Sequence, residues 1–189
     1  MAKKEVLKVE HVGMKFNLSQ EKVDDLKDYV IKLLKHQISY NEFWALKDIN
    51  FTLNKGDRLG ILGLNGAGKS TLMNVLYGLY QPTSGQIFVG GKEEVIHSPS
   101  RAIELGIGMV HQHFMLVQPF SVTENIILGM EPMKGLTVDL KTARKRVEEI
   151  SKRYNMQVDP DAKIEDISVG MQQRVEILKV LYRGADILI

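Results

Sequence analysis

A glycine-rich stretch carries the clearest chemical pattern in this chain. Residues 63–71 read Gly-Leu-Asn-Gly-Ala-Gly-Lys-Ser-Thr, which fits G-x-x-x-x-G-K-[ST] without a gap. Glycines let the backbone curl so that successive N–H groups point at one phosphate group. In this pattern Lys69 reaches the β- and γ-phosphates of a nucleotide, and the Ser70 hydroxyl binds Mg²⁺. The stretch, called the phosphate loop below, therefore predicts a nucleotide site.

The flanks of the phosphate loop support this interpretation. Residues 58–62 predict a buried strand, and residues 72–77 predict a helix. A strand, a glycine loop and a helix in this order form the expected context, and the positive end of the helix favours an anion. A glycine-rich turn that happens to precede a lysine is the alternative. The predicted ATP-binding residues of the loop are Gly63, Asn65, Gly66, Ala67, Gly68, Lys69, Ser70 and Thr71.

The composition limits the possible partners. A net charge of +2 gives no indication of a nucleic-acid partner. The chain has no cysteine, which excludes disulfides and thiolate metal sites. No apolar run approaches the length of a membrane span, so we expect any membrane role to go through a partner protein.

Hydrophobic periodicity predicts a mixture of strands and helices. Strands are predicted at 6–12, 46–53, 86–89 and 107–110, and helices at 100–105, 121–128, 140–154 and 168–182. This mixture indicates an α/β fold with an antiparallel β annex. Ser121 and Glu124 have the spacing of a capping box. An amphipathic helix is also predicted at about 21–38, either packed on the domain surface, which we favour, or contacting a membrane partner.

Two later segments narrow the class of nucleotide-binding protein. Val110-His111-Gln112 closes a predicted strand, and Ser168-Val169-Gly170-Met171-Gln172 begins a predicted helix. In this order after the phosphate loop, the segments resemble those of the ATP-binding subunits of ABC transporters. The resemblance covers essentially the whole chain. It implies a P-loop NTPase (ABC ATPase) core sheet flanked by helices, with the antiparallel annex and a helical subdomain at about 119–170.

The second segment, called the signature segment below, departs from the common family form Leu-Ser-Gly-Gly-Gln. Ser168 and Gly170 are kept, while Ile167, Val169 and Met171 stand at the other three places. A very similar run occurs in the subfamily that imports simple sugars and nucleosides, so we do not interpret the departure as a loss of function. A hydroxyl and an approachable N–H at a helix start suit an anion.

The resemblance implies roles for further residues and for partners. Gln112 would sense Mg²⁺ and the attacking water, and its loop would contact a transmembrane permease subunit. The signature segment would face the ATP held by a second ATP-binding subunit in a head-to-tail dimer. Phe16 would stack on adenine, with Tyr40, Phe43 and Trp44 as alternatives. The cofactors would be ATP and Mg²⁺, and the subunit would be peripheral, on the cytoplasmic face of the plasma membrane.

The resemblance is not uniform along the chain. Residues 12–48 resemble ATPases that export teichoic acid and related polysaccharides, whereas residues from about Met73 onward resemble nucleoside and sugar importers. The chain is therefore interpreted as a hybrid joined within or beside residues 63–72, or as one divergent lineage. The implied cargo is a nucleoside or sugar for import, or a cell-wall polysaccharide for export.

In the family, the strand that begins at Ala185 ends in an Asp-Glu pair, and a histidine follows later. Because the sequence stops at Ile189, residues 1–189 are expected to form a partial nucleotide-binding domain with no complete catalytic set and negligible hydrolysis. Two alternatives to a transporter subunit are a non-transport ABC ATPase, acting for example in translation or DNA maintenance, and a non-functional hybrid gene fragment.

Overall fold

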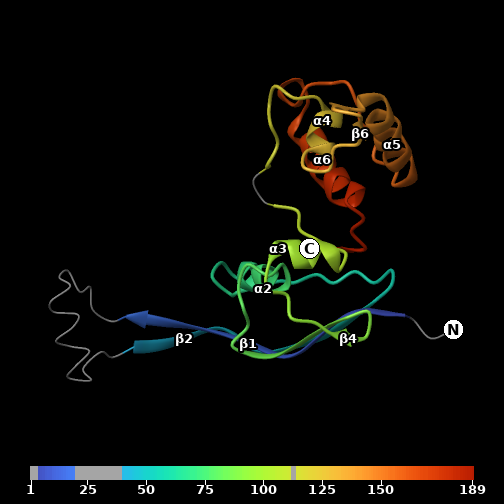
Figure 1. The fold of residues 1–189 in the computed structure, drawn as a ribbon. Helices are drawn as coiled ribbons and strands as arrows, with labels where there is room; N and C mark the ends of the chain where they lie inside the picture. The colour runs from blue at the N-terminus through green and yellow to red at the C-terminus, as the bar shows by residue number, and fades with distance from the viewer. Residues whose placement is uncertain (1–3, 20–39, 112–113) are drawn as a thin grey trace. The chain divides into compact units, whose positions relative to one another are not determined.

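The computed structural model describes residues 4–19, 40–111 and 114–189. The predicted helix at 21–38 and the predicted Mg²⁺ residue Gln112 lie outside these residues. The chain divides into two compact units, Met1–His97 and Ser98–Ile189 (Figure 1).

The first unit is built on an antiparallel sheet. Its strands are β1 (Glu5–Ser19), β2 (Tyr40–Asn54), β3 (Ser84–Val89) and β4 (Lys92–Glu93), in the order β2-β1-β3-β4. All three pairings are antiparallel, which confirms the predicted annex. Helix α2 (Lys69–Leu76) lies over one face of the sheet and buries Leu72, Val75 and Leu76 (Figure 1).

The predicted buried strand at 58–62 is wrong. The segment forms no strand, and its apolar side chains are exposed, with Leu62 at 97%. A strand inside a parallel sheet needs a hydrogen-bonded neighbour on each side. The four-stranded sheet of this unit contains only β1 to β4, and it pairs none of residues 58–62. The apolar pattern therefore indicated that residues 58–62 could form a strand, but it could not predict which strand would pair with them.

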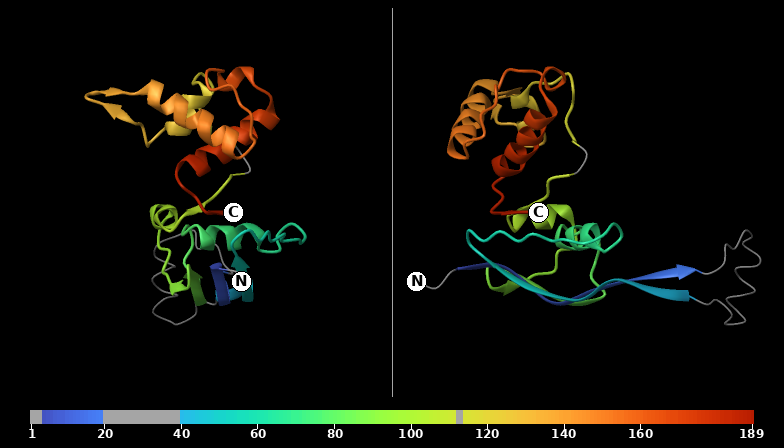
Figure 2. Two further views of the ribbon diagram at one scale, coloured as in Figure 1. Left: turned by 90° about the vertical axis from the view of Figure 1, so that its right-hand side faces the viewer. Right: turned by 180° about the vertical axis from the view of Figure 1, so that it is seen from behind.

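The second unit is mainly helical. Its elements are α3 (Pro99–Glu104), β5 (Ile107–Gly108), α4 (Val122–Ile127), β6 (Met133–Lys134), β7 (Thr137–Val138), α5 (Leu140–Arg153), the 3-10 helix η1 (Ile164–Asp166), α6 (Val169–Tyr182) and β8 (Ile187–Leu188). Strands β5 and β8 pair in parallel. Strands β6 and β7 form a hairpin that extends away from the helices (Figure 2, left). Helices α4, α5 and α6 share a core that includes Ile126, Val147 and Leu178.

The predicted capping box at the start of α4 is confirmed. The Glu124 backbone N–H donates to Ser121 Oγ at 3.2 Å, and the Ser121 backbone N–H donates to Glu124 Oε2 at 2.7 Å. The hydrogen bonds from the Ser121 N–H and hydroxyl lower the pKa of the Glu124 carboxyl. The carboxylate thus satisfies the helix end from within the chain, where it also complements the helix dipole.

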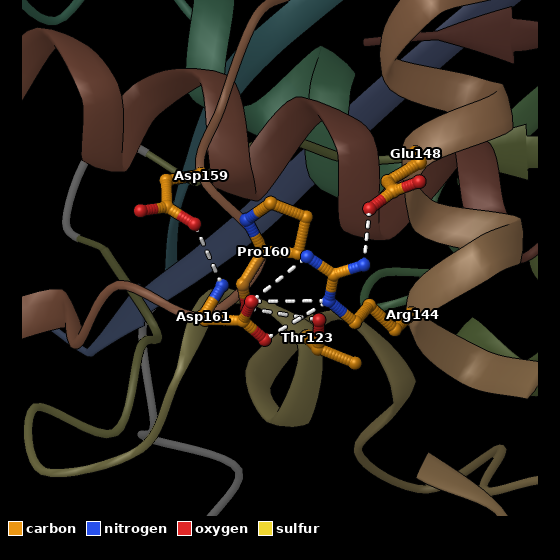
Figure 3. A network of polar contacts seen from close by, with 6 residues as sticks. All are labelled: Thr123, Arg144, Glu148, Asp159, Pro160 and Asp161. Carbon is orange, nitrogen blue, oxygen red and sulfur yellow. Dashed lines mark hydrogen bonds and ion pairs between the residues drawn. The ribbon is translucent and has the colours of Figure 1, made fainter. Parts of the chain in front are cut away.

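A second polar network ties α5 to the turn that precedes η1 (Figure 3). Arg144 donates through Nε and Nη2 to the Asp161 carboxylate at 2.9–3.1 Å, and its Nη1 lies 2.6 Å from Glu148 Oε1. The adjacent Pro160 carbonyl accepts from Thr123 Oγ1 at 2.9 Å. The bidentate geometry fixes direction as well as distance, so the turn is oriented against both α4 and α5.

The buried Asn125 joins α4 to the loop before it. Its side chain accepts from the Val117 N–H at 2.7 Å and donates to the carbonyl oxygens of Val117 and Ser121, both at 3.0 Å. Asn125 is fully buried, so water cannot replace these partners. An apolar side chain at this position would leave the Val117 amide and carbonyl unpaired.

We expect Asn125→Leu to lower the free energy of unfolding of the helical unit by at least about 2 kcal/mol, because buried polar groups lose their partners. Urea unfolding followed by circular dichroism measures the change. Lys141→Ala, at an exposed position of α5, serves as the control and should change the stability by less than about 0.5 kcal/mol. Equal effects of the two substitutions would contradict the assignment.

Candidate nucleotide-binding site

The phosphate loop turns at two glycines. Gly66 and Gly68 have φ angles of 84° and 81°, a region that other residues rarely adopt. The Ala67 N–H donates to the Leu64 carbonyl at 3.1 Å and closes the turn. A Cβ atom on Gly68 would lie 2.3 Å from the Ala45 carbonyl oxygen of β2. Gly68 is thus required twice, for its backbone angle and for its close approach to the sheet.

Lys69 points back into its own loop. Its Nζ atom donates to the carbonyl oxygens of Gly63 at 2.6 Å and Leu64 at 2.8 Å. An ammonium group has three donors, so these bonds place the cation beside the loop and can exchange for phosphate oxygens. Ser70 follows on the first turn of α2 and is exposed. The predicted residues 63–71 are therefore brought together at one helix start.

The start of α2 differs from the starts of the other described α-helices. Side-chain oxygens of Ser98, Ser121, Asp139 and Ser168 accept a backbone N–H at the starts of α3, α4, α5 and α6. Helix α2 begins after Gly68 with no side-chain cap and no acidic residue in its first turn. Its first N–H groups thus lack the oxygen that the chain provides elsewhere, which suits a phosphate anion.

The signature segment lies at the start of α6. Ser168 Oγ accepts from the Met171 N–H at 3.4 Å, as expected for an N-cap. Ser168, Val169 and Gly170 are exposed, and a Cβ atom on Gly170 would meet no atom within 4 Å. The surface at Gly170 is therefore open to close approach. The phosphate loop and this segment belong to different units.

The last two signature residues face their own unit. Gln172 Nε2 donates to the carbonyl oxygens of Ile164 at 3.2 Å and Ile167 at 3.4 Å. Met171 is partly buried, and its sulfur accepts from Arg174 Nη1 at 3.7 Å. These contacts fix the turn before α6. A ligand bound at the exposed residues could use the Gln172 amide group as a donor only after that group had left the carbonyls of Ile164 and Ile167.

The structure brings several of the candidate adenine-stacking aromatics into one region of the sheet. The Phe16 ring meets the Tyr80 ring edge-on at 5.8 Å between centroids. Phe16 lies opposite Phe43 in the β1–β2 register, and Phe43 is 50% exposed. Trp44 is 43% exposed and precedes Ala45, the residue that approaches Gly68. Tyr40 begins β2, and its side chain lies outside the described part. The choice of Phe16 stays a prediction.

The described residues offer no preformed metal site and no membrane-spanning helix. No group of three or more His, Asp or Glu side chains there could hold a metal ion. A Mg²⁺ ion bound by the Ser70 hydroxyl and by phosphate oxygens needs no such group. Ser70 therefore stays the predicted Mg²⁺ ligand among the described residues. None of the described helices has the length and apolar character to cross a membrane.

Sequence analysis did not single out two charged residues of α6. Glu176 is 3% exposed and Lys179 is partly buried, and both bind the backbone of Met115. The available signal was a Glu and a Lys three residues apart within the apolar run Val175 to Leu181. Charged residues at positions that face a core are rarely buried without a partner.

A glycine loop that places a lysine at an uncapped helix start, beside an antiparallel sheet and with a separate helical unit, defines a nucleotide-binding cassette of the P-loop class. The family described as ABC transporter matches residues 46–189 of this sequence. The chain belongs to the ABC transporter ATP-binding family, which confirms the family and the fold class expected from the sequence motifs.

Curated relatives are similar over most of the chain. The nucleoside import ATP-binding protein NupA of Lactococcus lactis is 60% identical over 160 residues, which cover 85% of this chain and 32% of NupA. The guanosine import ATP-binding protein NupO of Bacillus subtilis is 58% identical over 162 residues, covering 86% and 32%. The chain thus spans about a third of the length of these relatives.

A solved structure shows the same fold. CbiO1 from Clostridium perfringens, part of the ABC transporter complex CbiONQ, superposes with a TM-score of 0.67 and 27% identity. The superposition covers 98% of this chain and 64% of CbiO1. The resemblance of residues 12–48 to exporters and the proposed hybrid junction are tested by none of these similarities and stay predictions.

The two glycines of the loop give a matched test of its geometry. We expect Gly66→Ala to be strained by roughly 1–2 kcal/mol from its φ angle alone, because the space around it is empty. Gly68→Ala should cost more, since its Cβ would also overlap the Ala45 carbonyl. Thermal unfolding and binding of a fluorescent ATP analogue measure both effects. A smaller loss of thermal stability in Gly68→Ala than in Gly66→Ala would contradict the packing of the loop on β2.

Proposed function

We propose that this chain is the ATP-binding part of an ABC importer for a nucleoside or a simple sugar. The observation that carries this proposal is the 60% identity with NupA, together with an ordered phosphate loop at an uncapped helix start. A protein of this kind binds and hydrolyses ATP to drive transport, with a permease subunit as its membrane partner, at the cytoplasmic face of the plasma membrane. Polysaccharide export has support only in residues 12–48.

In this proposal the loop N–H groups and Lys69 hold the β- and γ-phosphates, and the Ser70 hydroxyl binds Mg²⁺. By analogy with the family, Gln112 senses Mg²⁺ and the attacking water, and its loop contacts the permease. The signature residues Ser168 and Gly170 of a second chain approach the γ-phosphate, which requires an open surface at Gly170. ATP would therefore lie between two chains, and its hydrolysis would separate them.

We expect Lys69→Ala to weaken ATP binding about ten- to a hundredfold, because a charge-assisted contact with the phosphates is lost. Ser70→Ala should lower the affinity for Mg-ATP and leave the affinity measured in EDTA nearly unchanged. Titration with a fluorescent ATP analogue, with and without Mg²⁺, measures both. Lys55→Ala, in an exposed turn of the same unit, is the control. Equal affinities in Lys69→Ala and the control would refute the site.

The cargo is tested by uptake. We expect the complete gene, expressed with its permease in a bacterium that lacks nucleoside uptake, to restore accumulation of labelled guanosine. Lys69→Ala in the same gene should abolish the accumulation. Accumulation of ribose or arabinose instead would assign a sugar cargo, whereas no accumulation of any of them would contradict the proposed import function.

A further inference from the structure

The helix that begins at the signature segment holds the backbone of a distant residue. The Met115 N–H donates to Glu176 Oε1 at 2.7 Å, and the Met115 carbonyl accepts from Lys179 Nζ at 3.0 Å. Glu176 and Lys179 are three residues apart on α6, so they lie on one side of the helix. Both backbone groups of Met115 are thus bound by opposite charges from one helix.

This arrangement costs folding free energy, because charged groups lose water, and it fixes one geometry. Glu176 is 3% exposed, and burial lowers the pKa of Lys179 while nearby Glu176 opposes that shift. A buried carboxylate loses its water, so Glu176 adds little stability compared with an apolar residue of similar size. The pair therefore contributes position more than stability: it binds one N–H and one carbonyl and nothing of the Met115 side chain, which is 62% exposed.

Glu176 and Lys179 thus form a clamp on the Met115 backbone, and a second clamp of the same kind holds Val117, two residues further along the chain. Asn125 of α4 binds both the N–H and the carbonyl of Val117. Between the two clamps, Leu116 packs against the core of the helical unit. The segment 115–117 is therefore held like a strand, with side chains of α6 and α4 in place of neighbouring strands.

We propose that Glu176 and Lys179 are positioning residues that fix the segment 115–117 to the signature helix α6, so that the two move together. Glu176 lies about two turns from Ser168 on a continuous helix, and a helix is stiff over this length. A shift of the signature end is thus carried to Met115, three residues after Gln112 in the sequence. The functional meaning of this link depends on the roles proposed above for Ser168 and Gln112.

Amide hydrogen exchange tests the clamp directly on the full chain. Glu176→Leu removes the acceptor, and Lys179→Met removes the donor while keeping the apolar stem. We expect exchange at the Met115 amide to rise about tenfold or more in Glu176→Leu, because a hydrogen bond to a carboxylate is lost. Glu176→Gln keeps an acceptor oxygen and should restore most of the protection. Met115→Ala leaves the backbone contacts in place and is the control.

The same variants in the complete importer provide the functional readout. We expect Glu176→Leu to lower kcat for ATP hydrolysis at least about fivefold with KM for ATP within about twofold, since the phosphate loop is unchanged, and Glu176→Gln to recover kcat. Unchanged exchange at the Met115 amide in Glu176→Leu would overturn the clamp. So would an equal rise in exchange at Ile126 and Val147, which would indicate general destabilisation. A loss of kcat in Met115→Ala equal to that in Glu176→Leu would overturn it as well. Failure of the unmodified chain to bind ATP would refute the proposed function instead, independently of the exchange result.

Discussion

The contact between Gly68 and the backbone of β2 is the constraint on which the first unit depends. Any side chain at residue 68 would overlap the Ala45 carbonyl, so the phosphate loop can lie only as close to the sheet as glycine permits. Helix α2 continues from this point, and its buried Leu72, Val75 and Leu76 fix its direction. The position of the phosphate site thus depends on the pairing of β1 with β2, which joins residues distant in the sequence.

The caps of the helices show which helix ends the chain satisfies by itself. Helix α4 fills its own N-terminus with the Glu124 carboxylate, and α5 uses Asp139. Helix α6 has only the neutral Ser168 hydroxyl, and α2 has no cap side chain. A carboxylate at a helix start repels a phosphate, whereas N–H groups without one attract it. Helix α3 also begins with a neutral serine, Ser98, so the caps set apart only α2, whose first N–H groups have no side-chain acceptor and are proposed to meet ATP.

Local signals predicted the parts of this structure that local physics determines. The capping box at Ser121 and the turning glycines of the phosphate loop each depend on residues within one turn. Residues 58–62 failed because a strand requires a partner that apolar periodicity cannot identify. The contacts of Gln172 with the carbonyls of Ile164 and Ile167 could not be predicted either, because periodicity did not indicate the 3-10 helix at Ile164–Asp166; the proposed role of Gln172 at ATP stays a prediction. The choice among Phe16, Phe43 and Trp44 depends on a ligand position, which the pattern of a strand does not contain.

The clamps on Met115 and Val117 explain how one loop can be both fixed and adaptable. Recognition through backbone groups holds the path of the chain whatever side chain stands at Met115, whereas recognition through side-chain packing would fix both together. The Glu176 carboxylate that binds Met115 is buried at a free-energy cost that an apolar residue would avoid, so its value lies in the single register that it permits. A loop held in this way keeps the Met115 side chain at the surface while α6 determines where it stands. In the proposed link, the signature end of α6 and the surface at Met115 are two ends of one element, because the same helix carries Ser168, Glu176 and Lys179.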